Sequence, residues 1–421
     1  MKKILQIVPL TIIGLFILSI FGWISVHISN GDKEFRLIGK TVKYMYTFPD
    51  LFATSVNEFR GLPETFIKTP ENFQSINKLD SNIIALTSYT DTDNSRIVAL
   101  INLKNDSILY SWSLHDRMSD HVRIFHPLLL PEKNLVYYQN YESLKRIDSL
   151  SNVIWKIDSL WPHHAINIDD QGDIWISTHK SDGVGLFSIN ERYVFFKDEY
   201  INKIDVETGS ILFQKSFTDI LTQNNLSNYL LKSGNVEDPI HINDIEPALK
   251  TTPYYQRGDV FISARSMSAI FHYRPATNKI IKVIEGPFVG QHDVDFYNDN
   301  SLVFFNNNKH PASNWEKNPA QIDSSQFVFA GDHYSQLVRY NFNNESFSFI
   351  GDQVFKANKI YTLSEGLVDF FENNTYFVEE QNSGILWIIK DNDVIYKNVM
   401  KSGHEGFHNL PNWTRIINNY E

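Results

Sequence analysis

The chain has 421 residues, of which 14% are aromatic, and a formal net charge of −11. This negative balance argues against nucleic acid as a partner, because binding a phosphate backbone requires a basic surface. Cysteine is absent, which excludes disulfides, thiolate catalysis and metal centres with cysteine ligands. The abundance of Phe, Tyr and β-branched residues favours strands over helices.

An apolar segment without charged side chains, Ile4–His27, follows Met1-Lys2-Lys3. As a helix it would extend roughly 36 Å, at about 1.5 Å per residue, which is enough to cross a bilayer. The lysines before it and Asp32 and Glu34 after it predict a cytoplasmic N-terminus and an exported remainder. Because no A-x-A cleavage site follows, an uncleaved transmembrane anchor in residues 1–28 is favoured over a cleaved signal peptide. We therefore expect a single-pass membrane protein with the rest of the chain exported.

Residues 29–75 contain prolines and glycines that interrupt any periodic pattern, among them Pro49, Gly61, Pro63 and Pro70. We interpret this stretch as an irregular stalk. The domain that carries the function is then expected in residues 76–421.

One pattern recurs throughout residues 76–421: an apolar strand, a polar turn rich in Asp, Asn or Gly, and a second apolar strand. Six copies are found, and most follow a further short apolar strand. The copies are Arg96–Leu114, Ser143–Asp158, Tyr200–Phe217, Ala269–Gly286, Gln336–Gly351 and Gly384–Asn398. Repeats of this kind predict an all-β fold, a six-bladed β-propeller in which blades pack face to face around a channel. The alternative is a β-sandwich, whose strands would not carry the same turn six times.

Histidines stand at equivalent places in three of these repeats. His164, in Trp161–Asp169, precedes the strand that begins at Gly172, and His241 and His292 precede the strands at Gly258 and Asn300. Arg265 ends the strand that follows His241. Because the innermost strands of a propeller line its channel, these side chains are expected to converge. His179, His272, His310, His333, His404 and His408 fall outside the pattern, and we assign them to the surface or to packing.

These segments resemble bacterial arylsulfotransferases. The resemblance is carried by HHAINID before GDIWIS, by IHINDIEP before GDVFISARSMSAIFHY, and by GQHDVDF before SLVFFNN. It extends in pattern over residues 75–421, including Ser364–Ile389 as the last full blade and the closing Trp413-Thr414-Arg415, and it is most specific in Asp238–Phe296. It implies a six-bladed propeller of the exported compartment that uses aryl sulfate esters rather than a nucleotide sulfate donor. Together with the predicted anchor, the resemblance implies a bacterial inner membrane, with the remainder of the chain in the periplasm or outside the cell. The family's separate N-terminal β-domain has no counterpart here.

The resemblance also implies roles for single residues. His292 corresponds to the nucleophile that becomes sulfated, His241 to a second histidine, and Arg265 to the arginine that binds the sulfate. The pair His163-His164 corresponds to a further histidine, and alignment of His164–Asn167 with His241–Asp244 favours His164 for the catalytic place. We expect Arg265, Asn243 and His163 on the substrate-binding side. Neither a metal nor another cofactor is expected, and a homodimer is left open.

The residue types suit such chemistry. Neutral imidazole, with an unperturbed pKa near 6.5, is a competent nucleophile at neutral pH. A guanidinium can donate two parallel hydrogen bonds to sulfuryl oxygens and does not lose its proton. His241 or His164 can protonate the leaving phenoxide and later deprotonate the phenolic acceptor.

Two other functions remain open from the sequence. Lys203–Gln214 resembles a repeat of quinone-dependent dehydrogenases, but the tryptophan that usually ends such hairpins is mostly missing and cysteine is absent. A non-catalytic propeller that serves as an interaction module of the cell envelope is the second alternative. It predicts that a substitution at His292 changes only local stability.

Overall fold

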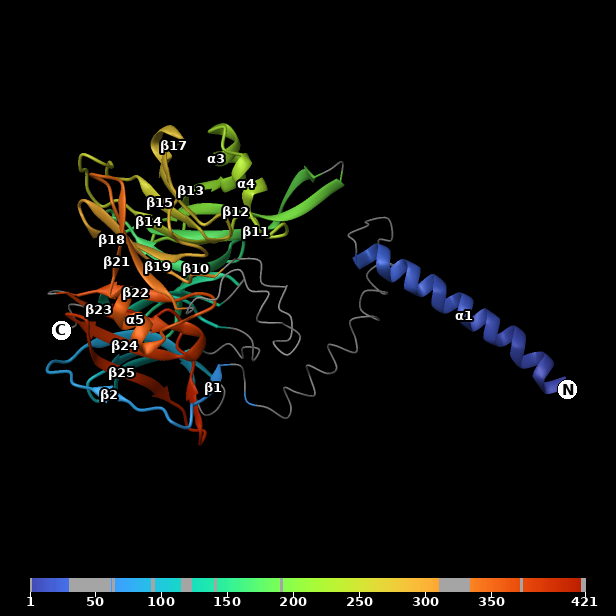
Figure 1. Ribbon diagram of the computed structural model, residues 1–421, viewed down its shortest axis with the longest axis horizontal. Helices are drawn as coiled ribbons and strands as arrows, with labels where there is room; N and C mark the ends of the chain where they lie inside the picture. Colours follow the sequence, from blue (N-terminus) through green and yellow to red (C-terminus); the bar gives the residue numbers. More distant parts are fainter. Residues whose placement is uncertain are drawn as a thin grey trace, which may run out of the picture. The chain divides into compact units, whose positions relative to one another are not determined.

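Figure 1 shows the computed structural model, which describes residues 2–29, 62, 65–91, 95–114, 123–139, 142–189, 192–309, 334–371 and 374–417. The chain divides into two compact units, Met1–Pro63 and Glu64–Glu421. In the first unit, α1 (Lys2–Ser29) is a helix of 28 residues. Within the described residues, no helix combines the length and the apolar character that crossing a membrane requires. The transmembrane anchor predicted for residues 1–28 is therefore not confirmed.

The second unit is built from antiparallel sheets, which we name I to VI in chain order. Five of them have four strands and sheet VI has seven. Sheet I contains β27 (Arg415–Ile417), β3 (Ile84–Thr90), β4 (Arg96–Asn102) and β5 (Ser107–Ser113). Sheet II contains β6 (Leu128–Leu130), β7 (Asn134–Tyr138), β8 (Leu144–Ile147) and β9 (Val153–Ile157). Sheet III contains β10 (Trp161–Ile168), β11 (Ile174–Ile189), β12 (Arg192–Ile204) and β13 (Ile211–Ser216).

The remaining sheets follow in the same order along the chain. Sheet IV contains β14 (Ile242–Pro247), β15 (Val260–Ala264), β16 (Ala269–Arg274) and β17 (Lys279–Ile284). Sheet V contains β18 (His292–Asn298), β19 (Ser301–Asn306), β20 (Gln336–Asn341) and β21 (Ser346–Ile350). Sheet VI contains β22 (Leu367–Phe370), β23 (Thr375–Glu380), β24 (Ile385–Lys390), β25 (Asp393–Lys401), β26 (Phe407–Asn409), β1 (Phe66–Lys68) and β2 (Ile76–Asn77).

This arrangement is an all-β propeller, and it corrects the predicted number of blades. Sheets I to V are four-stranded blades, so that five regular blades are found where six were expected. Sheet VI departs from the plan because β26 and β2 both pair with β25, and β1 pairs with β26. In Figure 1, β2 in blue accordingly lies beside β25 in red. Since β1 and β2 begin in or next to residues 29–75, part of that stretch is strand rather than irregular stalk.

The recurring polar turns have a common physical basis. In the turns after β8, β10 and β12, the side chains of Asp148, Asp169 and Asp205 accept hydrogen bonds from backbone N–H groups two to four residues further on. Such Asx-turns reverse the chain and satisfy donors that no strand can reach. All six predicted hairpins form.

The core consists of apolar layers between neighbouring sheets. Sheets III and IV share a layer that includes Trp175 and Phe271, and the layer between sheets V and VI includes Phe305 and Trp387. Burial of each of these aromatic side chains contributes roughly 2–3 kcal/mol to the stability of the fold. The ring is closed at its ends by β27, which pairs with β3. The short helices α3 (Phe217–Gln223), α4 (Asn228–Lys232) and α5 (Asp352–Asn358) lie between sheets in the sequence.

Candidate active site

The backbone is irregular at or just before the first strand of sheets III, IV and V. The side chains there consequently point in directions that a regular strand would not give them. The register of β10 shifts between Pro162 and Ile166, and His164 has φ +63°. His241, directly before β14, has φ +54°. In β18 the register shifts between His292 and Val294. Bulges of this kind re-aim side chains and are frequent next to active sites.

Three of the predicted histidines come together there. The ring centroid of His164 lies 4.9 Å from that of His241 and 5.8 Å from that of His292. The indole of Trp413 contacts two of these rings edge-on, at 5.6 Å from His164 and 6.2 Å from His292. Residues that lie far apart in the sequence therefore form one cluster with His164 at its centre.

The hydrogen bonds of His292 define its tautomer. Its Nδ1 lies 2.6 Å from Asn307 Oδ1 and 3.1 Å from the carbonyl oxygen of Gly290, and both are acceptors. The amide nitrogen of Asn307 donates to the carbonyl oxygens of Thr362 and Glu365, which fixes the orientation of that amide. The proton of neutral His292 is therefore on Nδ1. The lone pair is on Nε2, which accepts a hydrogen bond from the backbone N–H of Glu365 at 3.3 Å.

Burial and nearby positive charge keep the imidazoles of His292 and His164 neutral. His292 is 1% exposed. Burial first, and then the charge of Arg265, lower its pKa well below the usual value. The pKa of His164 is also lowered well below 6.5, by burial and by neighbouring groups that include His241 and Arg265. An unprotonated His292 is the form that a nucleophile requires.

Arg265 stands at the start of a 3₁₀ turn, Arg265–Met267, that follows β15. Burial lowers the pKa of its guanidinium, although the charges of Asp238 and Glu365 act in the opposite direction. Within the described part of the chain, no hydrogen bond or ion pair engages this guanidinium. Its N–H donors are therefore available to an anion held next to His292.

His241 forms a pair with an acidic residue that the sequence analysis did not single out. Its Nδ1 lies 2.6 Å from Asp238 Oδ2. Burial raises the pKa of Asp238, but the charge of His241 and its hydrogen bond outweigh burial, and the pKa ends well below the usual range. An ionised Asp238 orients the ring, so that Nε2 of His241 faces away from it and can exchange protons. The signal for this role was present, since His and Asp three residues apart adjoin the predicted strand.

Asn243 and His163 both make contacts that support the histidine cluster. Asn243 is fully buried, and its side-chain nitrogen donates to the carbonyl oxygen of Gln291 at 2.6 Å. It thus holds the backbone just before His292. Nδ1 of His163 lies 2.8 Å from Nδ1 of His164, and its other nitrogen faces a glutamate. Both residues support the cluster, and their contact with substrate stays a prediction.

Two further residues beside the cluster received no role in the site from the sequence, although Trp413 belongs to the closing segment of the resemblance. The Nε1–H of Trp413 is buried and has no hydrogen-bond partner within the described residues. Arg123 contacts both carboxylate oxygens of Glu365, at 2.6 and 3.2 Å, next to the N–H that reaches His292. The sequence offered little signal for either role, because Arg123 approaches from sheet II and Trp413 from the C-terminal segment.

The comparisons with known proteins concern sequence and fold. Residues 126–400, which are more than half of the chain, match the family described as arylsulfotransferase (ASST). No curated protein has a matching sequence.

Solved structures match in fold at low sequence identity. A protein of unknown function from Bacteroides caccae aligns with a TM-score of 0.51 and 10% identity, over 80% of this chain and all of that protein. Virginiamycin B lyase from Staphylococcus aureus aligns with a TM-score of 0.40 and 11% identity, over 80% of this chain and 89% of that enzyme. Identities this low bear on the fold alone.

Proposed function

Because the chain belongs to the arylsulfotransferase family, we propose that it moves a sulfuryl group from an aryl sulfate ester to a phenolic acceptor through a sulfated His292. The observation that carries this proposal is the tautomer of His292. Its Nδ1–H is engaged by Asn307, so that the lone pair is on Nε2, within the cluster that also contains His164 and His241. In the free chain this lone pair accepts the 3.3 Å hydrogen bond from the N–H of Glu365, which an incoming sulfuryl group would replace.

In the first step, the lone pair of His292 Nε2 forms a bond to sulfur while the bond between sulfur and the aryl oxygen breaks. The electron pair of that bond leaves on the phenoxide, which takes a proton from the imidazolium of His241. Asp238, ionised beside His241, stabilises that imidazolium before the transfer.

Charge on the sulfuryl oxygens is stabilised by donors that are already in place. Arg265 would supply parallel N–H groups, and the buried N–H of Trp413, which has no hydrogen-bond partner in the described residues, would be a second donor. Sulfuryl transfer resembles phosphoryl transfer, in which positioning and charge stabilisation account for most of the catalysis.

In the second step, the oxygen of the acceptor phenol attacks the same sulfur atom. Its proton passes to His241, the bond between sulfur and Nε2 breaks, and the electron pair returns to His292. No nucleotide sulfate donor enters this cycle, and the second step returns to His241 the proton that the first step used.

The test uses the full chain with 4-nitrophenyl sulfate, in the presence and absence of phenol. We expect continuous release of nitrophenolate with phenol, and release of no more than one equivalent per chain without it. His292→Gln should abolish both, whereas His404→Gln, at a histidine outside the cluster, should leave both unchanged. Continuous release without phenol would identify a sulfatase instead. The absence of any release would favour the non-catalytic interaction module.

Location at a bacterial inner membrane, with the propeller in the periplasm or outside the cell, stays a prediction from the charge pattern around residues 4–27. Fractionation of cells that express the full chain tests it: the protein should remain with the membranes after a high-salt wash. Homodimer formation is likewise untested, and sedimentation of the purified chain would answer it.

A further inference from the structure

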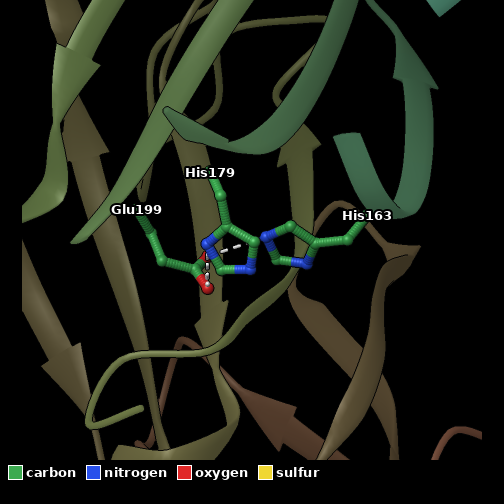
Figure 2. A group of neighbouring side chains, drawn as sticks. All are labelled: His163, His179 and Glu199. Carbon is green, nitrogen blue, oxygen red and sulfur yellow. Dashed lines mark ion pairs between the residues drawn. The ribbon is translucent and has the colours of Figure 1, made fainter. Parts of the chain in front are cut away.

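A group of side chains of the types that bind metals lies next to the reactive imidazoles, on the first three strands of sheet III. It consists of His163 on β10, His179 on β11 and Glu199 on β12. His179 and Glu199 are direct cross-strand partners, and the bulge in β10 brings His163 onto the same side. Figure 2 shows both imidazoles beside the Glu199 carboxylate.

The spacing of the possible ligand atoms is close to that of a coordination shell. His163 Nε2 lies 3.1 Å from Glu199 Oε2, and His179 Nδ1 lies 3.5 Å from Glu199 Oε1. The two imidazoles stack at 4.3 Å between centroids, and the three ligand atoms lie within 4.8 Å of one another. In tetrahedral zinc sites with bonds of about 2.0–2.2 Å, ligand atoms are separated by roughly 3.3–3.6 Å. Small side-chain movements would suffice to reach that geometry.

The protein alone leaves polar atoms of this group unsatisfied. Glu199 is fully buried, and its Oε2 accepts a hydrogen bond from the backbone N–H of Ile242 at 3.0 Å. Its Oε1 and the Nε2 of His163 are buried without a hydrogen-bond partner in the described residues, as is Asp238 Oδ1 nearby. His163 Nε2 is close to the carboxylate but is not aligned for a hydrogen bond. Unsatisfied buried groups of this kind are costly, and a bound cation would engage them.

We propose that His163 Nε2, His179 Nδ1 and the carboxylate of Glu199 bind one divalent transition-metal ion, with Zn²⁺ as the best match. Two imidazoles and one carboxylate form a ligand set typical of zinc sites that keep one position open, and imidazole ligands disfavour Mg²⁺ and Ca²⁺. A carboxylate oxygen of Asp238 lies within 4.8 Å of Glu199 and adds negative charge beside the site. The reaction proposed above has no step on this ion.

The metal would act on the reactive cluster through His163. Coordination by Nε2 places the proton of His163 on Nδ1, which then donates to Nδ1 of His164 at 2.8 Å. His164 would in turn carry its own proton on Nε2. The ion would therefore set the tautomer of the imidazole that lies between His241 and His292. This consequence depends on the proposed function, whereas metal binding itself does not.

The test measures binding to the purified full chain after treatment with a chelator. Calorimetric titration with ZnCl₂ should give one equivalent per chain, and the bound ion should raise the melting temperature. His179→Gln should weaken the affinity by at least about 100-fold, because one of three protein ligands is lost. His404→Gln is the matched control, since it removes an imidazole outside the group and should bind zinc like the wild type.

A second measurement avoids variants that fail to fold. Substitution of the wild-type chain with Co²⁺ should give the visible absorption of a four- or five-coordinate site, at one equivalent. Equal zinc binding by the wild type and a folded His179→Gln, or no cobalt absorption, would overturn the proposal. Sulfuryl transfer that persists in a metal-free chain would refute only the influence on His164. A zinc-loaded chain that transfers no sulfuryl group would refute the proposed function and leave the site standing.

Discussion

His292 owes its reactivity to residues that are distant in the sequence. Asn307 fixes its tautomer, burial and then the charge of Arg265 lower its pKa, and Asn243 anchors the backbone before it. Burial alone would also lower the pKa of an imidazole, but it would not choose which nitrogen holds the lone pair. Nucleophilicity at this position is therefore a property of the assembled channel.

Substitution of Arg265 separates its two effects. Arg265→Gln removes the hydrogen bonds to the sulfuryl oxygens and should lower kcat/KM by roughly 10²–10³-fold. It also removes a positive charge that lowers the pKa of His292, so that this pKa rises and the acid limb of the pH–rate profile moves to higher pH. Arg265→Lys should lose much of the rate but keep the acid limb of the wild type. The measurement is kcat/KM from pH 4 to 9, and an unshifted limb in Arg265→Gln would contradict the electrostatic role.

Individual residues were predictable where the repeat itself carried them. His164, His241 and His292 stood at equivalent places in three repeats, and the structure brings these histidines together. His179 was assigned to the surface or to packing, because nothing near it in the sequence indicates that Glu199 lies opposite on the next strand. Pairings across strands depend on register, which a single sequence does not reveal.

At the scale of elements, the loop before β22 positions the active site by a conformation that only glycine adopts easily. Gly366 has φ +99°, and a Cβ there would lie 2.6 Å from the ring of Phe305. The preceding N–H of Glu365 reaches His292. The left-handed backbone and the close packing therefore both require glycine at this position.

Gly366→Ala should lower the free energy of unfolding by about 2–4 kcal/mol, the sum of backbone strain and overpacking. Gly172 is the matched control, because it has φ +86° but nothing within 4 Å of its absent Cβ. Gly172→Ala should lower stability by only about 1 kcal/mol. Urea denaturation of both variants checks this prediction. Equal decreases in the free energy of unfolding would contradict the destabilising contact between the added Cβ and Phe305.

The elements themselves were predictable to the extent that they are local. The hairpin expected at Ala269–Gly286 appears as β16 and β17, because its strands and its turn adjoin in the chain. The pairing of β1 with β26 and of β27 with β3 joins segments more than 300 residues apart. No local pattern predicts such contacts, and for this reason the plan of sheet VI differs from the expected blade.

At the scale of the whole molecule, the ring is closed by contacts of the C-terminal segment. Both carboxylate oxygens of Glu379 accept backbone hydrogen bonds just before β27, from Trp413 at 2.8 Å and from Thr414 at 2.9 Å. These N–H groups are buried and would lack acceptors without Glu379. The same residue thus supports the closure and the position of the Trp413 ring beside His292.

Glu379→Ala should lower the free energy of unfolding by roughly 2–4 kcal/mol, because two buried donors lose their acceptors. Glu379→Gln keeps one acceptor oxygen and should lose about half as much. Guanidinium denaturation gives both values. If Glu379→Ala lowers the free energy of unfolding no more than Glu379→Gln does, these hydrogen bonds do not hold the propeller closed.

Buried carboxylates from several sheets surround Arg415, and they make stability depend on pH. Burial raises the pKa of Asp369 to about 6 and that of Asp244 to about 7. A raised pKa in the folded state means that the folded chain binds more protons than the unfolded chain. The stabilisation that results is fully present below about pH 4 and is lost as pH rises to 6 or 7.

Asp369→Asn tests this dependence, since the amide oxygen can still accept the hydrogen bond from the N–H of Ile416. Relative to the wild type, the variant should lose less stability between pH 4 and pH 7, by at most about 3 kcal/mol. Thermal unfolding across that range is the measurement. Parallel curves for the two proteins would contradict the raised pKa of Asp369.

The central claim is that His292 becomes covalently sulfated. The full chain should be mixed with 4-nitrophenyl sulfate without an acceptor, quenched in alkali, digested, and analysed by tandem mass spectrometry. We expect the mass of one sulfuryl group on the peptide that contains Gln291-His292-Asp293, with the group on His292, and its loss when phenol is added before quenching. Sulfuryl on another residue, or turnover with phenol while His292 stays unmodified at every time point, would contradict the account.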